Sequence, residues 1–124
     1  MLLGTGIGAN YVEQLNALIE KDGEETQLFR AMCEAEYVSI LENDGKFAEY
    51  NFAMEQKWFA MCVEDVNKWG KLFYQEAAYT ILEITVLNES LKYMFYSSRL
   101  DNIGPAYLAD IELLNKIMRR FRLL

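Results

Sequence analysis

The segment from Lys71 to Ser98 constrains the fold more than any other part of this sequence. It contains neither glycine nor proline and is apolar on nearly every side. The β-branched residues between Glu76 and Glu89 would also suit a strand. Because the segment is far longer than a normal strand, and no second convincing strand exists to pair with it, we predict one long helix. A helix with so few polar positions is typical of the centre of a bundle or of an oligomer interface.

Apolar stripes and end signals predict four further helices. The sequence Asn43-Asp44-Gly45 ends one of them, and Gly70 separates another from the long helix. Residues 101–105 form the clearest loop, and Pro105 suits the first position of the last helix. The expected ranges of these helices are 10–22, 24–43, 46–69 and 105–124. Since the connections are short, consecutive helices should be antiparallel neighbours. The sequence therefore predicts an all-α fold, an up-and-down bundle of four longer helices plus a short N-terminal helix.

The domain organisation follows from the length. A chain of 124 residues, 52% apolar and 25% charged, suits a single domain, which we place at residues 10–124 after a flexible N-terminal arm at residues 1–9. In the arm, Gly4, Gly6 and Ala9 formally match the dinucleotide-binding pattern Gly-x-Gly-x-x-Ala. No strand precedes them, so the match lacks the strand and helix context that the pattern needs.

Charge and hydropathy limit the partners and the compartment. The net charge is −7, with −9 in residues 1–65 and +2 in residues 66–124, which disfavours direct binding to nucleic acid. The start of the chain is a poor signal peptide, and charged residues interrupt the apolar stretch from Leu72 to Tyr96. Cys33 and Cys62 are too few for a disulfide framework. We therefore expect a cytoplasmic protein without a membrane span.

Several chemistries are disfavoured by residues that the sequence lacks. There is no histidine, so the commonest metal ligand and general base are missing. No glutamate has an acid three residues after it, so the Glu-x-x-Glu magnesium pattern is missing too. No serine sits in a Gly-x-Ser-x-Gly elbow, and neither cysteine has a partner base in the sequence. The sequence predicts no catalytic residue, no metal site and no cofactor.

The aromatic content points instead to protein binding. Tyrosine, phenylalanine and tryptophan make up 14% of the chain. Not all of these side chains can point inward from neighbouring helical positions. Large aromatic residues at a surface are enriched at protein interfaces. The candidate interface aromatics are Trp58, Phe59, Tyr93, Phe95 and Tyr96.

Taken together, these features predict a non-enzymatic protein-binding module, a small acidic inhibitor or immunity-type protein of phage or mobile-element type. Its partner would be a basic, nucleic-acid-handling protein, because opposite charges speed encounter. The candidate acidic face consists of Glu34, Glu36, Glu42 and Glu49.

Two alternatives stay open. The chain could be a homo-oligomeric structural or adaptor protein, such as a homodimer, that uses the apolar 71–98 helix as its seam. The cluster of Lys116, Arg119, Arg120 and Arg122 could contact a membrane surface or phosphate, although the dipole of the last helix already accounts for cations at its end.

Overall fold

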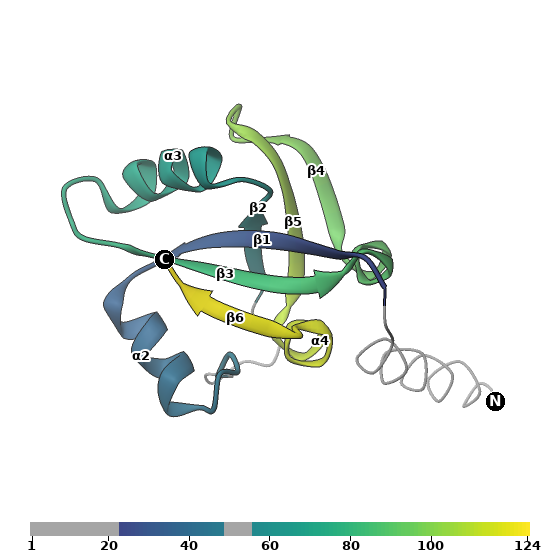
Figure 1. The fold of residues 1–124 in the computed structure, drawn as a ribbon. Helices are drawn as coiled ribbons and strands as arrows, with labels where there is room; N and C mark the ends of the chain where they lie inside the picture. Colours follow the sequence, from purple (N-terminus) through teal and green to yellow (C-terminus); the bar gives the residue numbers. More distant parts are fainter. Residues whose placement is uncertain (1–22, 49–55) are drawn as a thin grey trace.

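A computed structural model describes residues 23–48 and 56–124 of the chain, and in these ranges it shows a mixed α/β fold built on an antiparallel sheet (Figure 1). The sheet has the strand order β4-β5-β2-β1-β3-β6. Its strands are β1 (Glu25–Met32), β2 (Gln56–Ala60), β3 (Thr80–Leu87), β4 (Phe95–Leu100), β5 (Gly104–Asp110) and β6 (Arg120–Leu123). The helices of these ranges are α2 (Glu34–Glu42), α3 (Val63–Tyr74), α4 (Ile111–Ile117) and the short 3-10 helix η1 (Asn88–Tyr93).

The predicted all-α bundle is therefore wrong, and the 71–98 segment shows why. Its residues form the end of α3, then β3, η1 and β4. The break after α3 falls at Gln75, which has a positive φ of 53°. Glycine is the residue that usually adopts a positive φ at the end of a helix. Because glutamine holds this position, the sequence carries no glycine signal for the break. The same residues do not form a helical oligomer seam, because β3 pairs with β1 and β6 inside the sheet.

The other predicted helices within the described ranges are divided in the same way. The 24–43 segment forms β1 and then α2, which ends at Glu42 with Asn43 as its C-cap, as expected from the Asn-Asp-Gly signal. The described part of 46–69 holds β2 and most of α3, and 105–124 holds β5, α4 and β6. The predicted helix at 10–22 and the arm at 1–9 lie outside the described residues.

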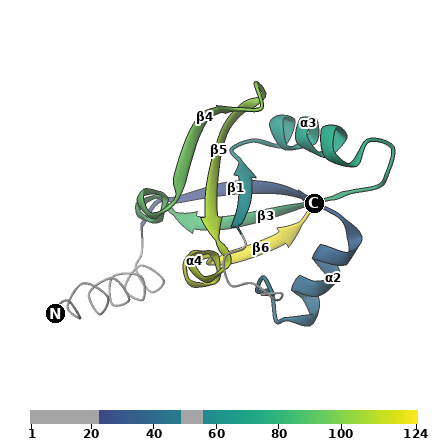
Figure 2. The same cartoon turned by 180° about the vertical axis from the view of Figure 1, so that it is seen from behind.

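The sheet consists of two halves that run across one another. Strands β4, β5 and β2 form one half and β1, β3 and β6 the other, and their directions cross in both views (Figures 1 and 2). The halves are joined through β1 and β2, whose pairing is confined to Phe29 opposite Ala60. Beyond this pair the two strands separate, so the two halves of the sheet diverge.

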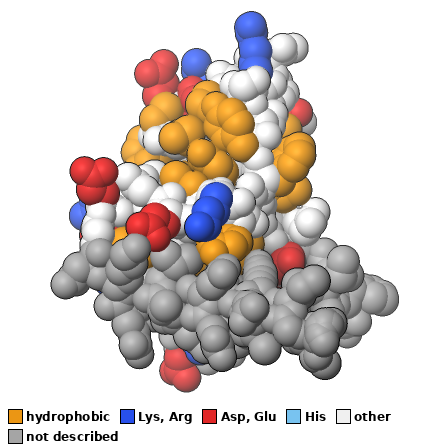
Figure 3. Space-filling model, turned by 90° about the vertical axis from the view of Figure 1, so that its right-hand side faces the viewer, with side chains coloured by type: hydrophobic (Ala, Val, Ile, Leu, Met, Phe, Trp, Pro, Cys, Tyr) orange, Lys and Arg blue, Asp and Glu red, His pale blue; other side chains and the backbone are white. Residues whose placement is uncertain are grey.

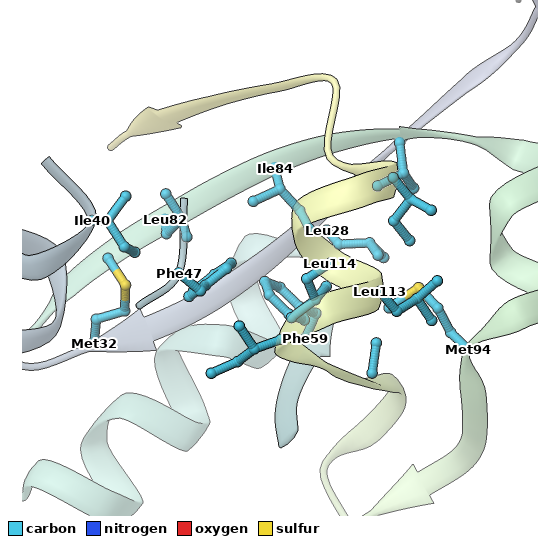
Figure 4. Packing of buried hydrophobic residues seen from close by; sticks show 14 of the residues in the cluster. Leu28, Met32, Ile40, Phe47, Phe59, Leu82, Ile84, Met94, Leu113 and Leu114 are labelled. Carbon is cyan, nitrogen blue, oxygen red and sulfur yellow. The ribbon is translucent and has the colours of Figure 1, made fainter. Parts of the chain in front are cut away.

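One face of the sheet carries the main core, beneath α2 and α4. Leu28 of β1 and Ile84 of β3 are fully buried there, and Leu114 of α4 packs against them (Figure 4). Phe59 of β2 belongs to the same core and meets Phe47 edge to face, with ring centroids 6.1 Å apart. Burying large aliphatic and aromatic side chains is the main stabilising contribution to such a fold.

The opposite face is covered by α3, which packs on β1 and β2 through Val66 and Trp69. These two residues lie against Phe29, Ala60 and Ala106 of three neighbouring strands. Because both faces of the sheet are covered, its central strands do not show the apolar and polar alternation of a half-exposed sheet. Because the sequence of these strands lacks the alternation, its apolar pattern predicts helices where the structure has strands.

Candidate functional site

A cavity of about 460 Å³ lies between α3 and the face of the sheet that it covers. Its volume falls in the range of sites that bind small molecules or hold the side chains of a partner. Most of its wall is apolar and aromatic. The lining residues are Phe29, Arg30, Ala31, Trp58, Phe59, Ala60, Val66, Trp69, Phe73, Tyr74, Leu100, Asp101 and Ala106.

Helical spacing places the α3 side of this cavity. Val66, Trp69 and Phe73 follow one another at intervals of three and four residues, so they share one face of the helix. Val66 and Trp69 are buried, whereas Phe73 at the end of the helix is 64% exposed. One stripe of α3 thus forms both a cavity wall and an exposed rim.

The turn between β4 and β5 closes another side of the cavity. Asp101 and Asn102 both have positive φ, and the backbone N–H of Ile103 donates to the carbonyl of Leu100, so the turn is of type I′. The carboxylate of Asp101 accepts a 3.0 Å hydrogen bond from Nε1 of Trp69. This bond attaches the middle of α3 to the turn.

Apolar surface continues outside the cavity. Phe95 of β4 is 64% exposed and contacts the ring of Trp58 edge to face, with centroids 6.1 Å apart. Leu72 and Phe73 of α3 are exposed as well. Figure 3, which looks at the side of the molecule where β4 lies, shows hydrophobic side chains over much of the described surface. Exposed apolar residues that adjoin a cavity in this way are characteristic of binding sites.

A group of charged residues lies where β1 and β2 separate. Arg30 donates to Glu36 from Nε at 2.6 Å and from Nη2 at 3.0 Å, a bidentate pair. Its Nη1 also donates to the backbone carbonyl of Trp58 at 3.3 Å, beside the position where the sheet ladder stops. Lys57 contacts the same Glu36 carboxylate at 3.4 Å. Arg30 therefore links the two halves of the sheet to α2.

This arrangement controls two protonation equilibria. Burial disfavours the charged form of Glu36, but the hydrogen bonds and charges of Arg30 and Lys57 outweigh it, so the pKa of this carboxyl lies below its usual value. Burial raises the pKa of Tyr74, and the nearby Glu36 carboxylate raises it further. At neutral pH, Glu36 is therefore ionised and Tyr74 is protonated.

The structure separates the three predicted acidic residues that it describes. Glu34 and Glu42 are exposed near the two ends of α2, while Glu36 turns inward to Arg30 and Lys57. Glu49 lies outside the described residues. Glu36 therefore already forms ion pairs within the fold, whereas Glu34 and Glu42 remain exposed.

Four of the five predicted interface aromatics lie on strands, on both faces of the sheet, and the fifth, Tyr93, is the last residue of η1. Phe95 and Tyr96 are exposed, Trp58 and Tyr93 are half-buried, and Phe59 is fully buried in the main core. Of the five, only Trp58 and Phe59 line the cavity. The expected helices at 46–69 and 71–98 divide Val66 and Trp69 from Phe73, so the sequence prediction lacks the α3 wall of the cavity. The spacing of these three residues is the signal that could reveal it.

The basic residues near the C-terminus of the chain contact acids of the sheet. Arg119 and Arg120 both pair with Glu25, and Arg122 pairs with Glu83. Since these acids lie on β1 and β3, the pairs tie residues 119–122 to β3, the neighbour of β6, and to β1, one strand further into the sheet. Matching to the dipole of a long final helix, which the sequence suggested, does not apply because α4 ends at Ile117.

Two further findings limit the chemistry of the described ranges. No three side chains of His, Cys, Asp and Glu lie close enough together in them to hold a metal ion. No helix in these ranges has the length and apolar character needed to cross a membrane. Comparisons of the chain with protein-family models, with curated proteins and with solved structures gave no match in any of the three.

Proposed function

We propose that this protein is a protein-binding module that takes an apolar side chain of its partner into the cavity beneath α3. The main support is that the aromatic wall of the cavity continues as exposed apolar surface through Phe73 and, by way of Trp58, Phe95. A small ligand inside the cavity would leave this rim in water. A partner protein would cover it, and a buried anchor surrounded by a rim is the usual anatomy of a protein interface.

The ionisable groups of the cavity support binding rather than catalysis. Arg30 is held by Glu36 and Asp101 by Trp69, while the raised pKa of Tyr74 keeps its hydroxyl protonated. Arg30 and Asp101 are thus already engaged in contacts within the fold, and a protonated Tyr74 hydroxyl is not a base at neutral pH. We therefore propose that the module is not an enzyme.

The net charge of −7 supports a partner with a basic surface. On this basis the inhibitor or immunity-type role against a basic, nucleic-acid-handling protein stays a prediction. Its test is the salt dependence of the association rate with that partner, which should fall steeply as salt is added.

The cavity itself supplies the assay for partner binding. The chain has two tryptophans, Trp58 and Trp69, and both line the cavity, so their fluorescence reports on its occupancy. A photoreactive phenylalanine analogue in place of Phe73 would first cross-link the partner in extract of the native host. The purified pair would then be titrated while tryptophan emission is recorded.

Two variants and one control decide the outcome. Phe73→Lys alters the rim and Ala31→Leu fills the cavity without removing apolar surface; each should weaken binding by about tenfold or more. Leu41→Lys changes a residue that is 53% exposed on α2 and does not line the cavity, so affinity should persist. Full affinity in Ala31→Leu would reject entry into the cavity. A small molecule that binds there while no protein does would reject the protein-binding proposal.

A further inference from the structure

The two edges of the sheet differ in how they are protected against pairing with another strand. Within the described residues, β4 forms one edge and β6 the other. An edge strand presents unpaired backbone donors and acceptors, and most proteins protect such edges with charges or bulges. The side chains of β4 and β6 differ in this respect.

The β6 edge is charged. Arg120 and Arg122 alternate with Phe121 along the strand. If two copies paired antiparallel about Phe121, Arg120 of one copy would lie opposite Arg122 of the other, and like charges in that position are destabilising. The edge therefore opposes self-pairing.

The β4 edge lacks such protection over its first three residues, which precede the irregularity between Ser97 and Leu100. Phe95, Tyr96, Ser97 and Ser98 carry no charge, and the two aromatic residues are 64% and 48% exposed. A shift of register between Ser97 and Leu100, opposite Pro105, confines the regular part of the strand to its beginning. An unprotected segment of this length can pair with one further short strand.

The charge pattern of β4 selects the occupant. Arg99 is its single charged residue. In an antiparallel pairing of two β4 strands centred between Tyr96 and Ser98, Arg99 lies opposite one of residues 93–97 of the second copy. These positions hold aromatic or uncharged side chains, so cations do not face each other and Arg99 can stack on an aromatic ring.

We propose that β4 is a self-association edge, through which two copies of this chain pair antiparallel to form one continuous sheet. Tyr96 and Phe95 lie on opposite faces of the strand, since Tyr96 pairs with Tyr107 in the register of the buried Phe59. Each face of the new junction therefore receives aromatic side chains from both copies. The contact is isologous, with its two-fold axis perpendicular to the sheet.

This geometry places the two α3 cavities on the same face of the joined sheet. The dimer would engage two partner molecules, or two sites of one partner, and gain avidity from the link. The two proposals share Phe95, and Leu100 of β4 lines the cavity, but Tyr96 and Ser98, whose variants test the dimer, do not line it. Failure of one proposal therefore leaves the other standing.

Light scattering of the full chain over a series of concentrations tests the proposal. The expected mass is twice the 14.4 kDa of one chain, reached at the higher concentrations. Tyr96→Lys places a cation near the two-fold axis in both copies and should return the mass to that of a monomer. The matched control is Leu123→Lys on the β6 edge, which should leave the dimer intact.

A second variant guards against loss of folding. Ser98→Lys changes an exposed residue of β4 and should also give a monomer, with a far-UV spectrum like that of the wild type. A wild-type chain that stays monomeric at all concentrations overturns the proposal. This result is expected if the β4 edge pairs with a strand of a different protein. A dimer that survives both β4 variants, or dissociates in Leu123→Lys alone, also overturns it.

Discussion

The indole Nε1 of Trp69 donates a 3.0 Å hydrogen bond to Oδ2 of Asp101. Trp69 is almost completely buried in the middle of α3, while Asp101 lies exposed in the turn between β4 and β5. The bond therefore connects two walls of the cavity that come from distant parts of the chain. An indole N–H needs such a partner when it is buried.

Removing the acceptor should loosen this connection. Asp101→Gly introduces a residue that tolerates the positive φ of 54° at this position. It leaves the Trp69 N–H without its partner, which costs about 1–2 kcal/mol of unfolding free energy. Denaturant unfolding followed by tryptophan emission measures this loss. Asp101→Asn is the matched control, because its amide oxygen can accept the same bond and Asn tolerates the same φ. Equal stability of the two variants would mean that the bond contributes nothing.

Glu36 makes stability depend on acid. Its folded-state pKa lies below the usual carboxyl value of 4.5, so unfolding takes up a proton as the pH falls. The stabilisation is thus fully present above about pH 4.5 and is lost as the pH falls through the lowered pKa. At neutral pH, Glu36→Gln should lose about 2–3 kcal/mol, because Arg30 and Lys57 lose the carboxylate that they share.

Urea unfolding at a series of pH values checks this. The gap in unfolding free energy between the wild type and Glu36→Gln should narrow below pH 4.5. Glu34→Gln alters an exposed acid in the same first turn of α2 and should cost far less at every pH. A gap that stays constant down to strongly acid pH would show that the ion pair is not its cause.

The sequence predicts local breaks in this fold better than it predicts element types. The Asn-Asp-Gly signal at 43–45 does end α2, where Gly45 has a φ of 81°, and the loop expected near Asp101 is a turn. Both signals rest on backbone conformation, which a residue type favours locally. The choice between helix and strand depends on what covers each face, and this is decided by residues far away in the chain.

Pro105 shows at a single residue that a local signal does not decide between helix and strand. Its position after a loop suits the start of a helix, yet it lies within β5. The strand accepts it because the register of β4 shifts opposite it, so no ladder hydrogen bond is needed there. The candidate site was predicted only in part for a related reason. Trp58 and Phe95 are among the predicted interface aromatics, but the cavity requires α3 to lie over the sheet, which no local pattern shows.

Gly70 should resist a substitution that usually stabilises helices. Gly to Ala within a helix gains up to about 1 kcal/mol. A Cβ at this position would overlap the ring of Tyr79. The ring cannot move away cheaply, since its hydroxyl donates to Oδ1 of Asn67 at 2.9 Å. Gly70→Ala should therefore lower the unfolding free energy by about 1–2 kcal/mol.

A double-mutant cycle separates the two effects. In a Tyr79→Ala background the obstacle is gone, so adding Gly70→Ala should be neutral or stabilising. Chemical denaturation of the four proteins gives the coupling energy directly. The same loss in both backgrounds would contradict the contact with the ring as its cause.

Asn102 should tolerate glycine and reject β-branched residues. It has a φ of 59° at the second central position of the type I′ turn. Asn and Gly adopt this conformation readily. Asn102→Val should cost about 1–2 kcal/mol, since a β-branched side chain collides with its own backbone there. Asn102→Gly should keep the wild-type stability within a few tenths of a kcal/mol, because the turn remains favourable. Thermal unfolding of both variants, each followed by tryptophan emission, compares them under one condition. If valine were accepted as easily as glycine, the turn would have to be of another type, and the Trp69 contact to Asp101 would lose its fixed support.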